Sequence, residues 1–180
     1  MSRSRRLRLP NHFPASPPII MDITSILLFL PFFVACAIAA LMGALFPAQR
    51  WYRSLKRPGW SPPAWLFGPV WTLLYILIAI AGWRLALFWP APAALAALVA
   101  WGVQIVLNAV WTPLFFGLRR PDLAFYEITI LWLAIAATIL LAAPVDGLAA
   151  LLMLPYLAWA GFAAALNFSI WRLNGSRPQA

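Results

Sequence analysis

The ionisable side chains of this sequence are few, and they are poorly placed for conventional catalysis. The only histidine, His12, precedes the first long apolar run, and the only cysteine, Cys36, lies inside it. Acid/base pairs, a Ser-His or Cys-His nucleophile and a protein-ligated metal site all need groups that these positions do not supply. The acids stand at or near the ends of apolar runs, and no two share a helical face: Asp22, Asp122, Glu127 and Asp146. The sequence therefore predicts no catalytic and no metal-binding residues.

Glu127 departs from this pattern, because it lies one turn inside an apolar run. An ionisable group within a membrane span is costly and often functional. One turn from the interface, however, its carboxylate can also reach lipid headgroups or pair with Arg119 or Arg120. Both interpretations stay open at this stage.

Polar and aromatic side chains inside the apolar runs recur at helical spacing. An unpaired amide in hydrocarbon costs on the order of a few kcal/mol, so such groups either pair between helices or line a cavity. Large rings beside a few fixed polar groups suit a flat, mostly apolar ligand. Three faces carry the pattern: Trp71 and Tyr75; Trp101, Gln104, Asn108 and Trp111; and Tyr156, Trp159, Ala163 and Asn167.

The tryptophans divide by depth. Those near the ends of the apolar runs are expected to act as interfacial anchors. A deep tryptophan needs a partner for its indole N–H, so the deep ones are the better ligand candidates. They are Trp71, Trp101, Trp111, Trp132 and Trp159.

The composition indicates an integral membrane protein. Hydrophobic residues make up 64% of the 180 residues and charged residues only 9%, against about 25% charged in soluble domains. The formal charge of +9 lies almost entirely outside the apolar runs. That placement is typical of loops flanking membrane spans and argues against nucleic-acid binding.

Five charge-poor runs are near the roughly 20 residues that a bilayer requires, and in lipid each must be helical. We therefore expect an all-α integral membrane protein with a five-transmembrane-helix bundle over residues 22–174, followed by a C-terminal tail at 175–180. The expected spans are about 23–46, 65–89, 93–116, 123–143 and 147–171.

Lysine and arginine predict the orientation. Eight lie on the side of the first and third loops and the C-terminus, against one on the other side, or five with the N-terminal tail. The bias places the C-terminus in the cytoplasm and the N-terminus outside. Residues 1–21 are rich in Arg, Ser and Pro, so we expect a disordered basic tail, with Met21 as a candidate natural start.

Several motifs in order resemble the tryptophan-rich sensory protein / translocator protein family, once called the peripheral benzodiazepine receptor. They are WY at 51–52, RPGWSPPAW at 57–65, VWTLLY at 70–75, NAVWTPLFFG at 108–117 and PYLAWAGFAAALNFSIWRLN at 155–174. The resemblance spans nearly the whole chain from Met21 to Asn174.

The resemblance implies a five-helix bundle, often a homodimer, that binds porphyrins such as protoporphyrin IX or heme, and benzodiazepine-site drugs, with no obligatory cofactor. The implied pocket opens under the loop joining the first two helices. Matched by motif, its lining is Tyr52, Pro62, Trp71, Asn108, Trp111, Trp159 and Ala163.

The stretch KRPGWSPPAWLFGPVW at 56–71 is pre-shaped by its four prolines. It is either an interfacial turn with tryptophan anchors or a semi-rigid lid whose Lys56 and Arg57 attract ligand carboxylates. Animal members carry a proposed cholesterol motif in the last helix, and here Phe168 replaces its tyrosine. Cholesterol binding is therefore doubtful.

Three functions fit this sequence. The first is a membrane receptor or sensor that captures porphyrin and influences tetrapyrrole handling. The second is a transporter of porphyrin or another amphiphile. The third is a light-dependent, porphyrin-degrading enzyme in which Trp71 and Trp159 react with the excited ligand, since weak oxidation would need no conventional catalytic group.

Overall fold

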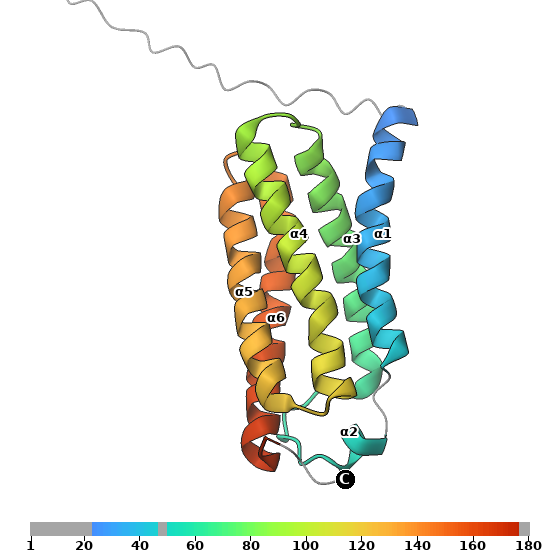
Figure 1. Ribbon diagram of the computed structural model, residues 1–180, viewed down its shortest axis with the longest axis vertical. Coiled ribbons are helices and arrows are strands. Elements are labelled where there is room, and N and C mark those ends of the chain that lie inside the picture. Colours follow the sequence, from blue (N-terminus) through green and yellow to red (C-terminus); the bar gives the residue numbers. More distant parts are fainter. Residues whose placement is uncertain (1–22, 47–49, 177–180) are drawn as a thin grey trace, which may run out of the picture.

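The computed structural model describes residues 23–46 and 50–176, and within these ranges the chain is helical and contains no strand. The expectations for the N-terminal tail and for Met21 lie outside the described residues. The helices, of which η1 is a 3-10 helix and η2 a π-helix, follow one another along the chain (Figure 1). They are α1 (Ile23–Leu45), α2 (Arg50–Ser54), η1 (Ala64–Leu66), α3 (Phe67–Ala86), α4 (Pro92–Thr112), η2 (Pro113–Gly117), α5 (Pro121–Ala142) and α6 (Gly147–Asn174).

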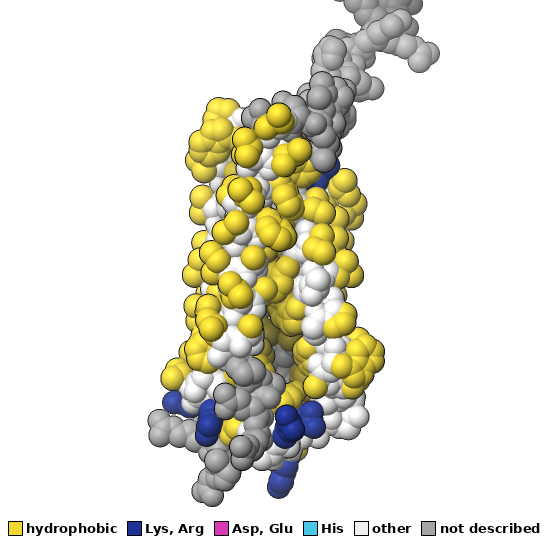
Figure 2. Space-filling view, turned by 90° about the vertical axis from the view of Figure 1, so that its right-hand side faces the viewer, with side chains coloured by type: hydrophobic (Ala, Val, Ile, Leu, Met, Phe, Trp, Pro, Cys, Tyr) yellow, Lys and Arg dark blue, Asp and Glu magenta, His cyan; other side chains and the backbone are white. Residues whose placement is uncertain are grey.

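Five of these helical segments are long and apolar enough to cross a membrane, which confirms the predicted fold class. They are α1, α3 with η1, α4 with η2, α5 and α6. Compared with the expected spans, α6 continues three residues further, to Asn174, and α3 ends at Ala86. On the face that Figure 2 shows, hydrophobic side chains run along the length of the bundle. The protein is therefore an integral multi-pass membrane protein, with its exposed leucines, valines and isoleucines facing lipid.

The long helices run up and down in one bundle (Figure 1). Helix α1 packs on α3 and α4, α4 packs on α5, and α6 packs on α5 and α3. Small buried residues at these contacts allow the backbones to approach closely. Gly82 shows the tightest case, because a Cβ there would lie 2.5 Å from the Phe32 ring and 2.6 Å from the Trp101 ring.

Local chemistry fixes where several helices begin. Pro92 and Pro121 stand in the first turns of α4 and α5, where a missing N–H costs nothing. Asp146 caps α6 by accepting hydrogen bonds from the backbone N–H groups of Leu148 and Ala149. The Asp146 carboxylate also pairs with Arg84 at 2.8 Å, which ties the α5–α6 loop to the end of α3.

The cations gather at one end of the bundle, as Figure 2 shows in part. Among the described residues, Arg84 is the cation at the end where α3 meets α4. The opposite end holds α2, the loop that follows it and the C-terminal end of α6 (Figure 1). Its described cations are Arg53, Lys56, Arg57, Arg119, Arg120 and Arg172. We call this the cationic end.

Candidate functional site

A cavity of about 420 Å³ lies inside the bundle toward the cationic end. All five membrane-spanning segments and α2 contribute to its wall, so the site exists only once the whole bundle has formed. The wall is mostly aromatic and aliphatic, which suits a flat apolar molecule. Its apolar members include Phe46, Phe67, Phe115, Phe116, Ile128 and Leu131.

The structure brings together six of the seven residues that the motifs assigned to a pocket. The six that line the cavity are Tyr52, Trp71, Asn108, Trp111, Trp159 and Ala163. The seventh, Pro62, is not among the described residues of the lining; Ala64, two residues later, is. Pro62 lies in the loop between α2 and η1.

Asn108 is the centre of a polar group on the cavity wall. The Tyr75 hydroxyl donates to Asn108 Oδ1 at 2.7 Å, and Asn108 Nδ2 donates to the Tyr156 hydroxyl at 3.0 Å. These bonds join α3, α4 and α6. The sequence left two roles open for this amide, interhelical pairing and cavity lining, and the structure shows that Asn108 has both. Its orientation is fixed from two sides before any ligand binds.

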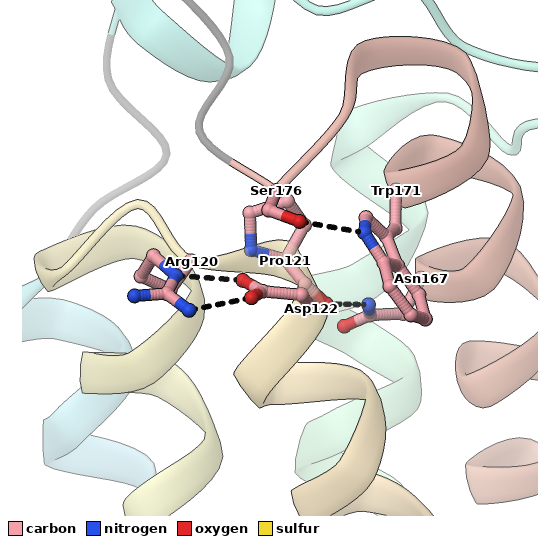
Figure 3. A network of polar contacts seen from close by, with 6 residues as sticks. All are labelled: Arg120, Pro121, Asp122, Asn167, Trp171 and Ser176. Atoms are coloured by element: carbon pink, nitrogen blue, oxygen red, sulfur yellow. Dashed lines mark hydrogen bonds and ion pairs between the residues drawn. The ribbon is translucent and has the colours of Figure 1, made fainter.

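Asn167 joins three elements nearer the cationic end. Its Nδ2 donates to the carbonyl of Pro121 at 2.6 Å, and the Trp111 indole N–H donates to its Oδ1 at 3.3 Å. Figure 3 shows Asn167 beside the start of α5, where Arg120 binds the Asp122 carboxylate. Asn167 also lines the cavity, so the Trp111 ring is held in place by a group that is itself fixed to α5.

Ring contacts hold the aromatic wall together. Trp71 lies 5.3 Å from the Tyr75 ring and 6.2 Å from the Tyr156 ring. Trp159 packs edge-to-face on Phe67, at 5.7 Å. The Trp159 indole N–H has no hydrogen-bond partner among the described residues. A buried indole N–H usually finds an acceptor, so this unpaired group departs from the usual pattern.

Helix α2 contributes Tyr52 to the cavity wall at the cationic end. Trp51, Tyr52 and Leu55 are buried in a cluster with residues of η2 and α6, so α2 is anchored on one side. The Arg57 guanidinium lies 5.3 Å from the centre of the Tyr52 ring, within reach of a cation–π contact. Positive charge therefore stands directly beside a cavity-lining ring.

Other polar and aromatic residues that the sequence singled out lie outside the cavity lining, and spacing alone did not distinguish them from the residues that line it. Trp101 donates its indole N–H to the Ile78 carbonyl at 2.9 Å and packs in the core. Gln104 is fully buried outside the cavity lining, and Trp132 is partly exposed. Glu127 is buried, and its carboxylate has no hydrogen-bond partner among the described residues, while Arg120 pairs with Asp122 instead.

Sequence reasoning missed the phenylalanines of the wall. Phe115 and Phe116 belong to the π-helix η2, which begins at Pro113. The wider turn places both rings beside Trp111, with the Trp111 and Phe115 rings stacked at 5.0 Å and 18°. The sequence PLFFG carried a signal for this turn. A proline inside a helix perturbs the hydrogen-bond ladder, and here two phenylalanines follow it closely.

Most of the chain is similar in sequence to known proteins. A family model described as the TspO/MBR family matches residues 25–172. Protein CrtK of Rhodobacter capsulatus is 46% identical over 156 residues, which cover 86% of this chain and 98% of that protein. The tryptophan-rich sensory protein of Cereibacter sphaeroides is 42% identical over 153 residues, covering 85% and 95%. The human translocator protein is 36% identical over 151 residues, covering 79% and 88%.

Proposed function

This chain belongs to the TspO/MBR family of membrane proteins, and we propose that it is a receptor that binds porphyrins in the cavity of its helix bundle. Bound protoporphyrin IX or heme would then influence tetrapyrrole handling or signalling. The observation that carries the proposal is the cavity wall, which combines three indoles with a fixed amide: Trp71, Trp111, Trp159 and Asn108.

The shape and chemistry of the wall support a flat ligand. Large rings present apolar faces, and they are held in place by the hydrogen bonds of Asn108 and Asn167. A preorganised site loses little entropy on binding. Benzodiazepine-site ligands, which are smaller and also flat, fit the same description.

The charge at the cationic end supports a ligand with carboxylates. Arg53, Lys56 and Arg57 are exposed around the loop. Of the acids in the described ranges, Asp122 lies nearest this end and is engaged by Arg120. A porphyrin inserted with its apolar edge inward would leave its propionates among these cations, where opposite charge favours them. We further propose that this end faces the cytoplasm, as the charge bias favours.

A light-dependent reaction is the second candidate, because Trp71 and Trp159 both line the cavity. An indole in contact with an excited porphyrin can act as electron donor, and dioxygen would serve as the terminal oxidant. Porphyrin transport is the remaining alternative. It requires release on both sides of the membrane, and binding alone does not.

The test is a titration of protoporphyrin IX into the protein in lipid nanodiscs, followed by tryptophan fluorescence in the dark. We expect saturable quenching that is weakened in Trp71→Phe and Trp159→Phe. The matched control is Trp132→Phe, because Trp132 lies outside the cavity lining. Binding unchanged in both cavity variants would contradict the proposed location.

Two further readings separate the alternatives. Absorbing products that form only under illumination, and only with both cavity tryptophans present, would establish the photochemical reaction. Porphyrin flux into sealed vesicles would establish transport. Saturable binding with neither result supports the receptor.

A further inference from the structure

The cavity wall is covered on one side and open on the other. Lining residues from α2, α4, η2, α5 and α6 are buried or half-buried, whereas every exposed member of the described lining belongs to α1, η1 or α3. Surface that faced only the interior of the cavity would be shared by all of its walls, so the asymmetry indicates a gap on the α1 and α3 side. The exposed members are Ala40, Gly43, Ala64, Gly68 and Thr72. We call this gap the side opening.

Helices α1 and α3 lie side by side, and they are in close contact at the end opposite the cationic end (Figure 1). The Trp83 indole N–H donates to the Ser25 carbonyl at 3.0 Å, and the Phe29 and Trp83 rings meet edge-to-face at 6.1 Å. The Phe32 ring reaches the backbone of α3 at Gly82, where a Cβ would lie only 2.5 Å from it. The two helices therefore leave no room for a ligand between them at this level.

Nearer the cationic end, the two helices pack on different neighbours. The Phe46 ring, directly after α1, lies 3.0 Å from where a Cβ of Gly117 would stand, so this end of α1 packs on η2. At the start of α3, Phe67 packs on Trp159 of α6, with the ring centres 5.7 Å apart. The cavity lies between these two contacts, and the small residues of the side opening border it there.

The border of the side opening suits hydrocarbon. A Cβ at Gly43 or at Gly68 would meet no atom within 4 Å, so both positions face open space. The Thr72 hydroxyl donates to the Gly68 carbonyl at 3.0 Å and is thus satisfied within its own helix, as lipid requires. Neither α1 nor the part of α3 before Arg84 carries a charged residue.

The side opening faces the bilayer and not water. Its residues lie within the membrane-spanning stretches Ser25–Leu45 and Ala64–Ala86. Large apolar neighbours on the same helices are exposed to lipid, with 56% of Leu41 and 58% of Leu73 accessible. The opening begins at Ala64, at the cationic end of α3, and continues for about two helical turns to Thr72. A chain that leaves the cavity here enters hydrocarbon directly.

We propose that the cavity takes flat ligands that carry one long hydrocarbon tail, with the ring inside the bundle and the tail passing through the side opening into the bilayer. A closed pocket would have to enclose the tail or exclude the ligand. Here the ring is buried while the tail never leaves hydrocarbon, so the tail adds no cost of transfer. The inference rests on the proposed function and adds the ligand class, a porphyrin-like ring esterified on one side chain with a long alcohol. Its remaining carboxylate stays among the cations.

The test compares two monoesters of protoporphyrin IX, the methyl ester and the hexadecyl ester. Each keeps one carboxylate and the same ring, so they differ in the tail alone. Both are titrated into the full chain in lipid nanodiscs, with ligand expressed as its ratio to lipid, because both dissolve in the bilayer. The saturable tryptophan quenching that Trp71→Phe and Trp159→Phe weaken reports binding in the cavity. We expect Kd values that agree within about threefold, and a hexadecyl ester that binds more weakly than this would overturn the proposal.

Two variants narrow the side opening. Gly43→Leu and Gly68→Leu each place a side chain at its border, where a Cβ has open space around it. Each should weaken binding of the hexadecyl ester about tenfold more than binding of the methyl ester. The control Gly102→Leu also has open space but lies outside the lining, so both esters should bind it as they bind the wild type. Equal losses for the two esters in the variants of the opening would overturn the path of the tail.

Photolabelling locates the tail without any variant. A hexadecyl ester that carries a diazirine close to its ester group should label α1 and α3 around Gly43 and Thr72, and excess methyl ester should suppress this labelling. Labelling spread evenly over the lipid-facing helices, or unaffected by the methyl ester, would overturn the proposal. Failure of the methyl ester to bind saturably would overturn the proposed function as well. Binding of the methyl ester with exclusion of the hexadecyl ester would overturn only the inference about the tail.

Discussion

Replacement of Asn108 by leucine should loosen the bundle where α3, α4 and α6 meet. Leucine has a similar size, so the change removes hydrogen bonds without opening a large hole. Two bonds disappear, those with the Tyr75 and Tyr156 hydroxyls. Both hydroxyls then lie in a low-dielectric interior with one partner fewer.

The magnitude follows from the membrane setting. Interhelical hydrogen bonds in bilayers average about 0.6 kcal/mol, with a maximum of about 1.7 kcal/mol, because the unfolded chain in lipid also finds partners. Losing two should therefore lower the free energy of unfolding by about 1–3 kcal/mol. Tyr75→Phe removes one bond and should cost about half as much.

Reversible unfolding in mixed micelles would measure these values. A double-mutant cycle between Asn108→Leu and Tyr156→Phe isolates the bond between the two side chains, since each single change removes it. We expect a coupling of about 0.6–1.7 kcal/mol. A coupling of zero, or a leucine variant as stable as the wild type, would refute the account of Asn108 as the fixed polar point of the cavity.

Three further changes test other parts of the structure. Gly82→Ala should destabilise the bundle by about 1–3 kcal/mol, because a Cβ there meets the Phe32 and Trp101 rings. The control Gly102→Ala should cost nothing, because a Cβ at Gly102 has open space around it. Equal unfolding midpoints for the two variants would contradict the close approach at Gly82. Asp146→Ala should lower the free energy of unfolding by about 1–2 kcal/mol through loss of the α6 cap. Arg84→Gln, which removes only the ion pair, should lower it less. The reverse order in thermal unfolding would argue against the cap. Ala163→Thr should weaken protoporphyrin binding about tenfold at unchanged stability, since it adds atoms to the cavity wall, whereas Ala165→Thr on the exposed side of α6 should bind as the wild type does.

Sequence patterns predicted the fold well because hydrocarbon leaves the backbone few alternatives. A charge-poor run of bilayer length must be helical, so the spans expected at about 93–116 and 123–143 correspond to α4 with η2 and to α5. The side of a helix that faces inward also follows from spacing. Trp71 and Tyr75 share a face in the sequence and stand together on the cavity wall.

Position along the helix axis was harder to predict. Gln104 and Asn108 share one face of α4, yet Asn108 lines the cavity and Gln104 does not. Periodicity gives the angle around a helix and says nothing of where the neighbouring helices separate. The same limit applies to Trp101, whose N–H bonds to a backbone carbonyl of α3.

Local sequence patterns could not predict contacts between distant segments. The π-helix that brings Phe115 to Trp111 depends on how the chain leaves α4. The pairing of Asn174 with Lys56 joins residues 118 positions apart and involves a backbone group, which carries no side-chain signature in the sequence.

The most direct test of the central claim is a structure of the protein crystallised from lipid with protoporphyrin IX. We expect the macrocycle in the cavity, in van der Waals contact with Trp71 and Trp159 and with its propionates toward Arg53, Lys56 and Arg57. Porphyrin bound only on the lipid-facing surface of the helices, with the cavity unchanged, would contradict it.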